Sequence, residues 1–184
     1  MDAFESVISG ILQRLGYWTQ NSVKVELTKE EKRQIGRYCS PRWELDVVGY
    51  SGRSNELLVV ECKSFLDSRG VQCSVFDGSN PEGEKRYKLF CEETLRSVVL
   101  NRLRLQCFER GFCPADAMVT LCLAAGKVDG DEEWLKRQFE SHGWRLWPPS
   151  FIREQLEVLR DIGYENDVAA VVAKLLLRQP KVSQ

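Results

Sequence analysis

Three charged side chains lie in two neighbouring apolar segments and could do chemistry. Asp46 lies inside the segment Trp43–Tyr50, and Glu61 and Lys63 end the segment that starts at Glu56. Both segments have the length and apolar content of β-strands. Alternate side chains of a strand share a face, so Glu61 and Lys63 point the same way. Charges at the end of a buried strand need a partner or an ion.

The turn between the two segments predicts which residues face each other. Residues 51–55 read Ser-Gly-Arg-Ser-Asn, which is turn chemistry. A turn centred between its third and fourth residues would place Asp46 directly opposite Glu61, with Cβ atoms about 4.5–5.5 Å apart. Two carboxylates so placed repel each other unless a cation lies between them, and a divalent metal with oxygen ligands would account for the pair. A shift by one residue would put the carboxylates on opposite faces.

A third carboxylate precedes these strands. Apolar residues recur at helical spacing from Phe4 to Leu15, and Gly16 supplies a stop signal. Glu5 lies at the margin of this apolar stripe. We therefore expect its carboxylate to point toward the packed sheet.

Asp46, the fourteen residues that follow it, and Glu61-Cys62-Lys63 resemble the PD-(D/E)xK signature of the restriction-endonuclease-like nuclease superfamily. An upstream helix that carries Glu5 is also similar to that family's common core, and the resemblance covers roughly residues 1–125. Leu45 stands where the signature has proline, which is the variable part of the pattern.

The resemblance implies a role for each of these residues. Asp46 and Glu61 would hold Mg²⁺ against a scissile phosphate, together with the backbone carbonyl of Cys62. Glu5 would bind a metal directly or through water, and Lys63 would position the attacking water or stabilise charge. Mn²⁺ is expected to substitute for Mg²⁺. The implied activity is hydrolysis of DNA phosphodiester bonds in a restriction, repair or defence role.

Two groups of cations could contact the phosphates of DNA. The first lies in the stretch 84–110 and the second in the polar stretch 28–41. The candidate binding residues are Lys85, Arg86, Lys88, Arg96, Arg33 and Arg37. The alternative is a solvated helix face on which these cations pair with acids three or four residues away.

The remaining sequence predicts the elements that position this site. Strands are expected over 17–27, 43–50, 56–63, 117–125 and 144–147, and helices over 4–15, 84–110 and 131–142, with two more after Pro148-Pro149. Residues 28–41 and 65–83 are expected to be connections. This order predicts an α/β fold with a mixed central β-sheet flanked by helices, a restriction-endonuclease-like core. We expect that core over residues 1–147 and a helical C-terminal extension packed on it over 148–184.

Composition excludes several other classes. The chain has 184 residues, 43% of them hydrophobic, and a formal net charge of −1, which fits one soluble globular domain, or at most two small ones, and no disordered or membrane-spanning chain. Seven cysteines without a Cys-x-x-Cys pair, and a single histidine, argue against zinc sites and nucleophile–histidine triads. The acidic start Met1-Asp2 does not resemble a signal peptide, so a cytoplasmic protein with reduced thiols is expected.

Two rival functions remain open at this stage. One is a non-catalytic nucleic-acid-binding or assembly module on the same fold. The other is a structural protein in which Lys63 forms a plain salt bridge with Asp46 or Glu61. RNA is an alternative substrate to DNA, and a homodimer is considered because cutting both strands needs two active sites.

Overall fold

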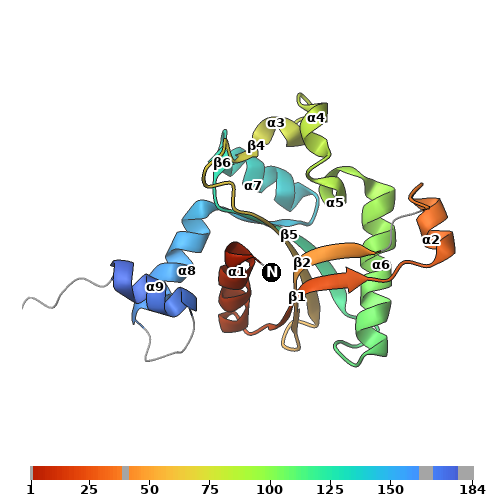
Figure 1. Ribbon diagram of the computed structural model, residues 1–184, viewed down its shortest axis with the longest axis horizontal. Helices are drawn as coiled ribbons and strands as arrows, with labels where there is room; N and C mark the ends of the chain where they lie inside the picture. Colours follow the sequence, from red (N-terminus) through yellow and green to blue (C-terminus); the bar gives the residue numbers. More distant parts are fainter. Residues whose placement is uncertain (1, 39–41, 162–167, 178–184) are drawn as a thin grey trace, which may run out of the picture.

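A five-stranded mixed sheet forms the centre of the molecule in a computed structural model (Figure 1). The structure describes residues 2–38, 42–161 and 168–177. The strands, in spatial order, are β1 (Trp18–Val25), β2 (Trp43–Ser51), β3 (Glu56–Lys63), β5 (Met118–Ala125) and β7 (Arg145–Trp147). β1, β2 and β3 are antiparallel neighbours, whereas β5 runs parallel to β3 and β7 runs parallel to β5. The expected α/β class with a mixed sheet is thus confirmed.

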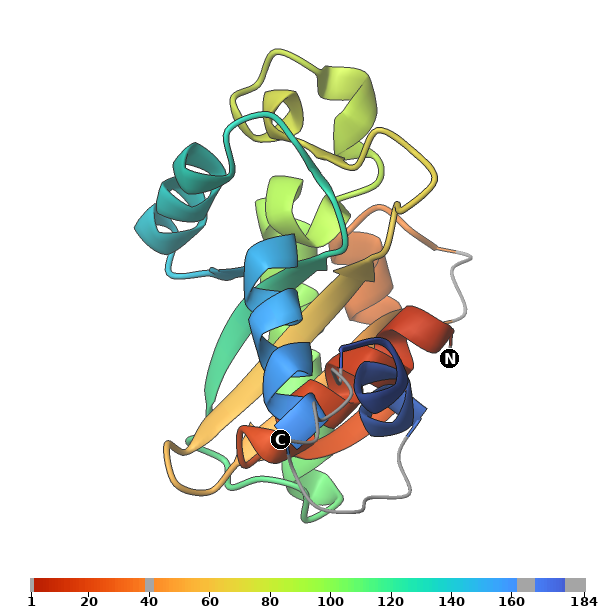
Figure 2. The ribbon, with the colours of Figure 1, turned by 90° about the vertical axis from the view of Figure 1, so that its left-hand side faces the viewer.

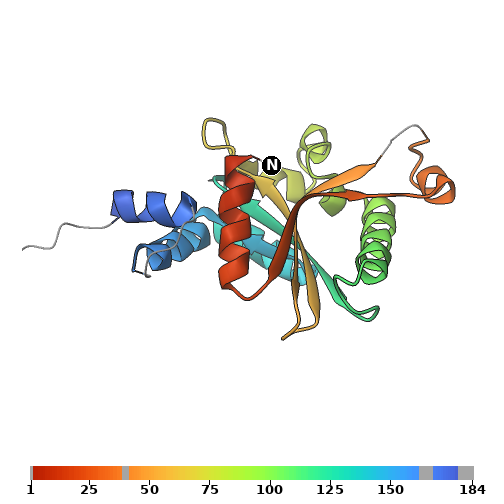
Figure 3. The same ribbon diagram turned by 60° about the horizontal axis from the view of Figure 1, so that its bottom comes forward.

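Helices cover both faces of this sheet (Figure 3). α1 (Ala3–Arg14) packs Ile8, Ile11 and Leu12 on one face, and α6 (Glu93–Glu109) packs on the other face. β3 is apolar toward both helices: Leu58 and Val60 belong to the core on the α1 side, and Leu57 and Val59 to the core on the α6 side. Burial on both faces is typical of a strand inside a sheet with helices above and below it.

The beginning of α1 is fixed by its own sequence. The Asp2 side chain accepts a hydrogen bond from the amide of Glu5, and the Glu5 side chain accepts one from the amide of Asp2, which together form a capping box. Gly16, with φ of +91°, ends the helix as expected. The predicted helix over 4–15 is confirmed.

The helix predicted over 84–110 is wrong, because the chain breaks it twice. Residues 81–109 form α4 (Pro81–Glu84), α5 (Lys88–Cys91) and α6. Tyr87 and Glu92 leave helical geometry, with φ/ψ of −130°/40° and −102°/96°. These breaks allow Tyr87 and Phe90 to be buried against Phe76. Burial of aromatic rings here outweighs the helix propensity of the sequence.

The stretch expected to be irregular, 65–83, also holds regular structure. β4 (Val71–Gln72) pairs in parallel with β6 (Val128–Asp129), and α3 (Cys73–Phe76) follows β4. Together with α4, α5 and α7 (Glu132–Ser141), these elements form a group beyond the sheet, at the top of Figure 1.

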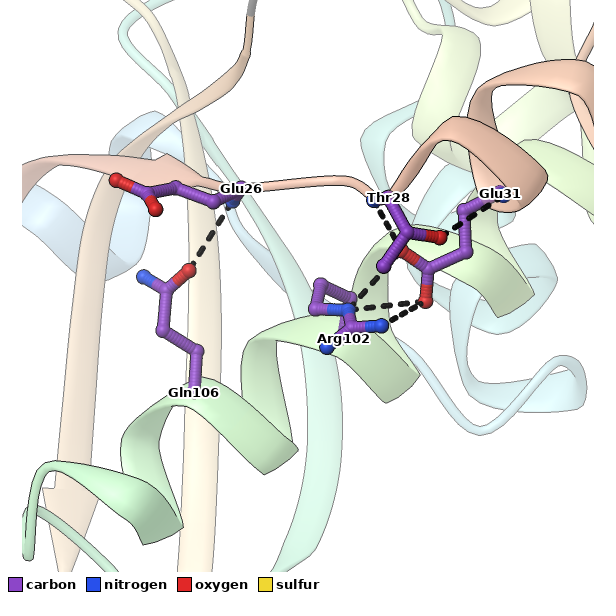
Figure 4. Close-up of polar contacts among 5 residues, drawn as sticks. All are labelled: Glu26, Thr28, Glu31, Arg102 and Gln106. Atoms are coloured by element: carbon purple, nitrogen blue, oxygen red, sulfur yellow. Dashed lines mark hydrogen bonds and ion pairs between the residues drawn. The ribbon is translucent and has the colours of Figure 1, made fainter.

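The connection expected over 28–41 contains a short helix, α2 (Lys29–Gln34), that is tied to α6 (Figure 4). Thr28 and Glu31 form its capping box, and Arg102 of α6 donates to both carboxylate oxygens of Glu31 at 2.9 and 3.0 Å. One turn further along α6, Gln106 accepts from the amide of Glu26 at 3.1 Å and donates to the Lys24 carbonyl at 2.9 Å. The predicted connection over Cys39–Pro41 lies outside the described residues.

Two helices, α8 (Pro149–Asp161) and α9 (Val168–Leu177), close the chain and contact α1 (Figure 2). Ile152 of α8 joins the core on the α1 side, and Val7 of α1 packs against Leu159 and Ala169. α8 begins at Pro149 itself and not after it, since a proline in the first turn lacks only an N–H that would have no helical partner. Among the described residues, we find no helix with the length and hydropathy required to cross a bilayer.

Candidate functional site

The predicted hairpin register is confirmed. Cα pairs between β2 and β3 run from Val47↔Val60 to Ser51↔Glu56, which places Asp46 and Glu61 one step beyond the last pair. On its other side β3 continues to pair with β5 as far as Lys63. The two carboxylates therefore stand where β2 and β3 part while β3 is still held by β5.

The alternation of side chains between the two faces of β2 is interrupted at Asp46. Leu45 and Val48 pack in the core on the α6 side, whereas Val47 packs on the α1 side. A regular strand would give Leu45 and Val47 the same face. The neighbouring strand is distorted at the same level, since Ser22 of β1 has φ of +51°. Because of this distortion, the Asp46 side chain is not confined to either face of the sheet.

The side chain of Asp46 contacts the main chain of β3. Its Oδ2 atom accepts a hydrogen bond of 2.7 Å from the amide nitrogen of Cys62. Because the N–H and C=O of one strand residue point to the same side, the Cys62 carbonyl also faces the β2 side. The next carbonyl, of Lys63, faces β5 and accepts from the amide of Gly126 at 2.9 Å. The carbonyl that the resemblance names as a ligand thus faces the same edge as Asp46.

Glu61 and Lys63 lie side by side at the end of β3. Nζ of Lys63 is 3.7 Å from Oε2 of Glu61, and the two side chains are 21% and 16% exposed respectively. Burial raises the pKa of Glu61 to about 7, and the charges of Asp46 and Glu5 add to this rise, while Lys63 opposes it. A buried carboxylate under repulsion from other acids is a favourable ligand for a cation.

Glu5 approaches this group from α1 but is also used locally. Its Oε2 atom accepts the amide of Asp2 at 3.2 Å in the capping box. Partial burial raises the pKa of Glu5, and the charges of Asp2 and Asp46 contribute to the rise although the hydrogen bond from the Asp2 amide lowers it. Glu5 therefore lies close enough to Asp46 to act electrostatically on it.

The oxygen atoms gathered at this point match what a magnesium ion requires. Within residues 2–38, 42–161 and 168–177, no three side chains of His, Cys, Asp or Glu come together as a metal-binding group. The arrangement offers Asp46, Glu61 and the Cys62 carbonyl. Mg²⁺ is commonly bound through one or two carboxylates, with water and phosphate oxygens in its other positions. The residues present fit Mg²⁺ in that form, with Glu5 as an outer neighbour.

Three of the cations predicted to bind nucleic acid have partners within the chain. Lys85 pairs with Glu82 at 2.7 Å, and Arg37 pairs with Glu92 at 3.0 Å and lies 5.0 Å from the ring centre of Trp43. Arg96 donates to two main-chain carbonyls, at 3.2 and 2.9 Å. Arg37 and Arg96 therefore make contacts that stabilise the fold.

The other predicted cations are better placed for a ligand. Arg33 on α2 and Arg86 between α4 and α5 are exposed, and Lys88 is half-buried. The structure does not bring these residues into contact with the carboxylates. They remain candidate phosphate contacts on two segments that flank the sheet.

A second buried charge, which the sequence pattern did not indicate, lies at the opposite end of β3. Glu56 is 2% exposed and accepts from Tyr17 at 2.5 Å, from Thr120 at 2.6 Å and from Arg145 at 2.7 Å. Its partners come from three other elements or their ends, up to 89 residues away. All three partners donate hydrogen bonds to the Glu56 carboxylate, so we interpret the Glu56–Arg145 ion pair as structural.

Comparisons with models of protein families, with curated proteins and with solved structures found no match to this chain.

Proposed function

We propose that this protein is a Mg²⁺-dependent nuclease that hydrolyses DNA phosphodiester bonds on a restriction-endonuclease-like core. One observation carries the proposal: Asp46 and Glu61 lie one step beyond the last β2–β3 pair, close enough for the charge of Asp46 to raise the pKa of Glu61, and Lys63 lies 3.7 Å from Glu61. Lys63 offsets only part of the charge of the two acids, which supports a cation beside them. Such a grouping supports the metal site that the Asp…Glu-x-Lys pattern leads us to expect.

The order of elements supports the same core. α1 is followed by three antiparallel strands, then α6, then a strand parallel to β3. The resemblance leads us to expect a helix with a glutamate, a strand, the aspartate strand, the Glu-x-Lys strand, a helix and a further strand. The chain adds to that order the helices α2, α3–α5 and α7–α9 and the short strands β4, β6 and β7.

The residues would divide the chemistry among them. Asp46, Glu61 and the Cys62 carbonyl would hold Mg²⁺, which lowers the pKa of a bound water and stabilises charge on the phosphate. Lys63 would orient the water or stabilise the developing charge. Glu5 would add negative charge beside Asp46 and hold a water on that side. Arg33, Arg86 and Lys88 would contact phosphates away from the reacting bond.

Plasmid cleavage in Mg²⁺ or Mn²⁺ tests the proposal. Asp46→Ala and Lys63→Ala should each lower cleavage at least about 100-fold, because each removes a group acting on the reacting phosphate. Glu44→Gln is the matched control, since Glu44 is an exposed acid on the same strand. Cleavage that survives Asp46→Ala, or that EDTA does not stop, would overturn the assignment.

A non-catalytic nucleic-acid-binding module is the second candidate. The Lys63–Glu61 ion pair partly neutralises the site, and the described residues hold no three-acid cluster, which both favour binding without turnover. This candidate predicts DNA binding that neither EDTA nor Asp46→Ala changes, and no cleavage. The same plasmid and binding assays therefore separate the two functions.

A further inference from the structure

A small polar hollow lies in the group of elements beyond the sheet, between β4, α3 and the chain from α4 to α5. Its volume is about 220 Å³. Gly70 and Gln72 lie in one wall, and residues from the stretch 80–87 form the other. Pockets that bury a whole drug-sized molecule have volumes of about 300–1,000 Å³, so this hollow suits a smaller group, of about the size of a phosphate.

The hydroxyl of Tyr87 is a polar group in this hollow without a partner. Tyr87 is 4% exposed, lines the hollow, and makes no hydrogen bond with any described residue. Among the described residues, Nδ2 of Asn21 is the only fully enclosed polar side-chain atom without a partner, so the Tyr87 oxygen reaches an open surface. The ring is held by an edge contact with Phe76, at 5.2 Å between ring centres. The hydroxyl can therefore donate to an acceptor that enters the hollow.

Arg86 supplies a cation at the same place. Its side chain lines the hollow, is exposed, and forms no ion pair with a described residue. Burial raises the pKa of Tyr87 to about 12, and the charge of Arg86 opposes this rise, so the guanidinium lies near the phenol. The hydroxyl keeps its proton at neutral pH. The two residues thus offer one ligand a charged donor and a neutral donor.

The amide side chains of the hollow are held by each other. Nδ2 of Asn80 donates to Oε1 of Gln72 at 3.2 Å, and Oδ1 of Asn80 accepts from the amide of Gly83 at 3.1 Å. A Cβ atom at Gly83 would lie 2.5 Å from Cγ2 of Val75, so only glycine allows α4 to pack this closely on α3. These walls are formed before any ligand binds, which lowers the entropy cost of binding.

The charges around the hollow favour an anion. Glu82 is the one acid among the described residues of its lining, and Lys85 pairs with it at 2.7 Å. Arg86 and the exposed Arg69, which directly precedes Gly70, are left as cations without an ion pair to a described residue. A phosphate group combines negative charge with oxygen acceptors only, and so matches the guanidinium and the hydroxyl.

The hollow lies beyond the ends of the strands that lead to the proposed metal site. The amide of Gly126, which follows β5, donates to the carbonyl of Lys63 at 2.9 Å, and the amide of Val71 donates to the carbonyl of Lys127 at 2.9 Å. These main-chain contacts connect the end of β3 to the wall that contains Gly70. Figure 2 shows the group of α3 and α4 above the arrowheads of β3 and β5. Ligands of open α/β sheets bind beyond the carboxyl ends of the strands.

We propose that this hollow binds a phosphate group of the nucleic acid, other than the phosphate that is cut. Arg86 and the hydroxyl of Tyr87 donate to its oxygens, and Arg69 contacts the same strand at the rim. The inference rests on the proposed function, because the hollow would hold the strand whose reacting phosphate reaches Asp46 and Glu61. An internal phosphate and a terminal phosphate present the same chemistry to these donors.

Binding of oligonucleotides in EDTA tests the hollow without any cleavage. The probes are single-stranded oligothymidylates of equal length with a 5′-phosphate, with a 3′-phosphate or with neither, followed by the NMR amide signals of Gly70 and Gly83. Arg86→Gln should weaken binding at least about tenfold and Tyr87→Phe about three- to tenfold, because they remove a charged and a neutral hydrogen bond. Tyr87→Phe keeps the ring. Arg53→Gln, at an exposed arginine in the turn at the far end of β3, is the matched control and should change binding less than about twofold.

The three oligonucleotides identify the phosphate that is bound. Tighter binding of one phosphorylated strand, which Tyr87→Phe reduces to the level of the unphosphorylated strand, assigns the hollow to that terminal phosphate. Equal binding of all three, weakened alike by Arg86→Gln and Tyr87→Phe, assigns it to an internal phosphate. Wild-type binding by Tyr87→Phe, or equal weakening by Arg86→Gln and Arg53→Gln, overturns the hollow as a phosphate site.

The outcomes separate this inference from the proposed function. Cleavage of DNA by a protein whose Gly70 and Gly83 signals do not move with any oligonucleotide overturns the hollow alone. Binding that Arg86→Gln and Tyr87→Phe weaken, in a protein that cuts no DNA, supports the hollow and overturns the nuclease. Thermal unfolding of each variant checks that it is folded.

Discussion

Asp46 is joined to the strand that carries its neighbouring acid: its Oδ2 atom accepts a 2.7 Å hydrogen bond from the amide of Cys62. This hydrogen bond takes the place of a main-chain hydrogen bond between β2 and β3, whose last Cα pair is Val47↔Val60. It keeps an acid beside Glu61 although their charges repel. The side chain therefore has a structural role that is separable from any role in binding a metal.

Two substitutions of Asp46 should separate these roles. Asp46→Asn keeps an oxygen acceptor, so its metal-free stability should stay near that of the wild type. Asp46→Ala leaves the Cys62 amide without this partner and should lower the free energy of unfolding by about 1–3 kcal/mol. Both should lower the pKa of Glu61, because both remove a negative charge. Denaturant unfolding and NMR titration of Glu61 measure the two effects; equal stability of the two variants would contradict the structural role.

The raised pKa of Glu61 makes the metal-free protein less stable as the pH rises. The folded protein holds the Glu61 proton up to about pH 7, whereas the unfolded chain releases it near its ordinary pKa of 4.5. Stability from this group is therefore complete below about pH 4.5 and is lost as the pH rises to 7, by at most about 3 kcal/mol. Glu61→Gln should remove this dependence and stabilise the protein at pH 8 in EDTA.

Mg²⁺ should stabilise the protein more as the pH rises, because it binds the ionised form of Glu61. Metal binding requires the carboxylates to be deprotonated, so the rise in melting temperature with Mg²⁺ should be larger at pH 8 than at pH 5.5. The rise should be absent in Glu61→Gln. A shift that is the same at both pH values, or that survives the substitution, would place the ion elsewhere.

The sequence could predict the strands and their register because that information is local. Alternation, apolar runs and the turn at 51–55 are all contained within Trp43–Lys63. The breaks at Tyr87 and Glu92 were not predictable in this way, since they depend on burial of Phe90 against Phe139, which is 49 residues away. For the same reason the partners of Glu56, which are 39 to 89 residues away, could not be found from the sequence alone.

The contact between Arg102 and Glu31 should hold α2 on the body of the molecule. Arg102→Ala removes a two-oxygen contact between side chains that are 24% and 21% exposed, and should cost about 1–2 kcal/mol of unfolding free energy. It should also increase hydrogen exchange across α2. Arg104→Ala, two residues along the same helix, is the control and should change stability by less than about 0.5 kcal/mol. Arg33 on α2 is a candidate phosphate contact. Loss of the Arg102–Glu31 contact should therefore also weaken DNA binding, although Arg102 itself is not proposed to contact DNA.

The buried Glu56 should depend on Arg145 for its charge. Burial opposes ionisation of Glu56, but donation from Thr120 and Tyr17 and the charge of Arg145 outweigh it, so its pKa is lowered. This stability is present above the ordinary pKa and is lost as the pH falls. Arg145→Met should therefore destabilise the protein more at pH 7 than at pH 4, by about 1–3 kcal/mol at pH 7, because it leaves a buried charge with fewer partners. In the double variant with Glu56→Gln most of that loss should be recovered, as a double-mutant cycle measures. Additive losses at pH 7 would mean that the 2.7 Å ion pair contributes no coupling.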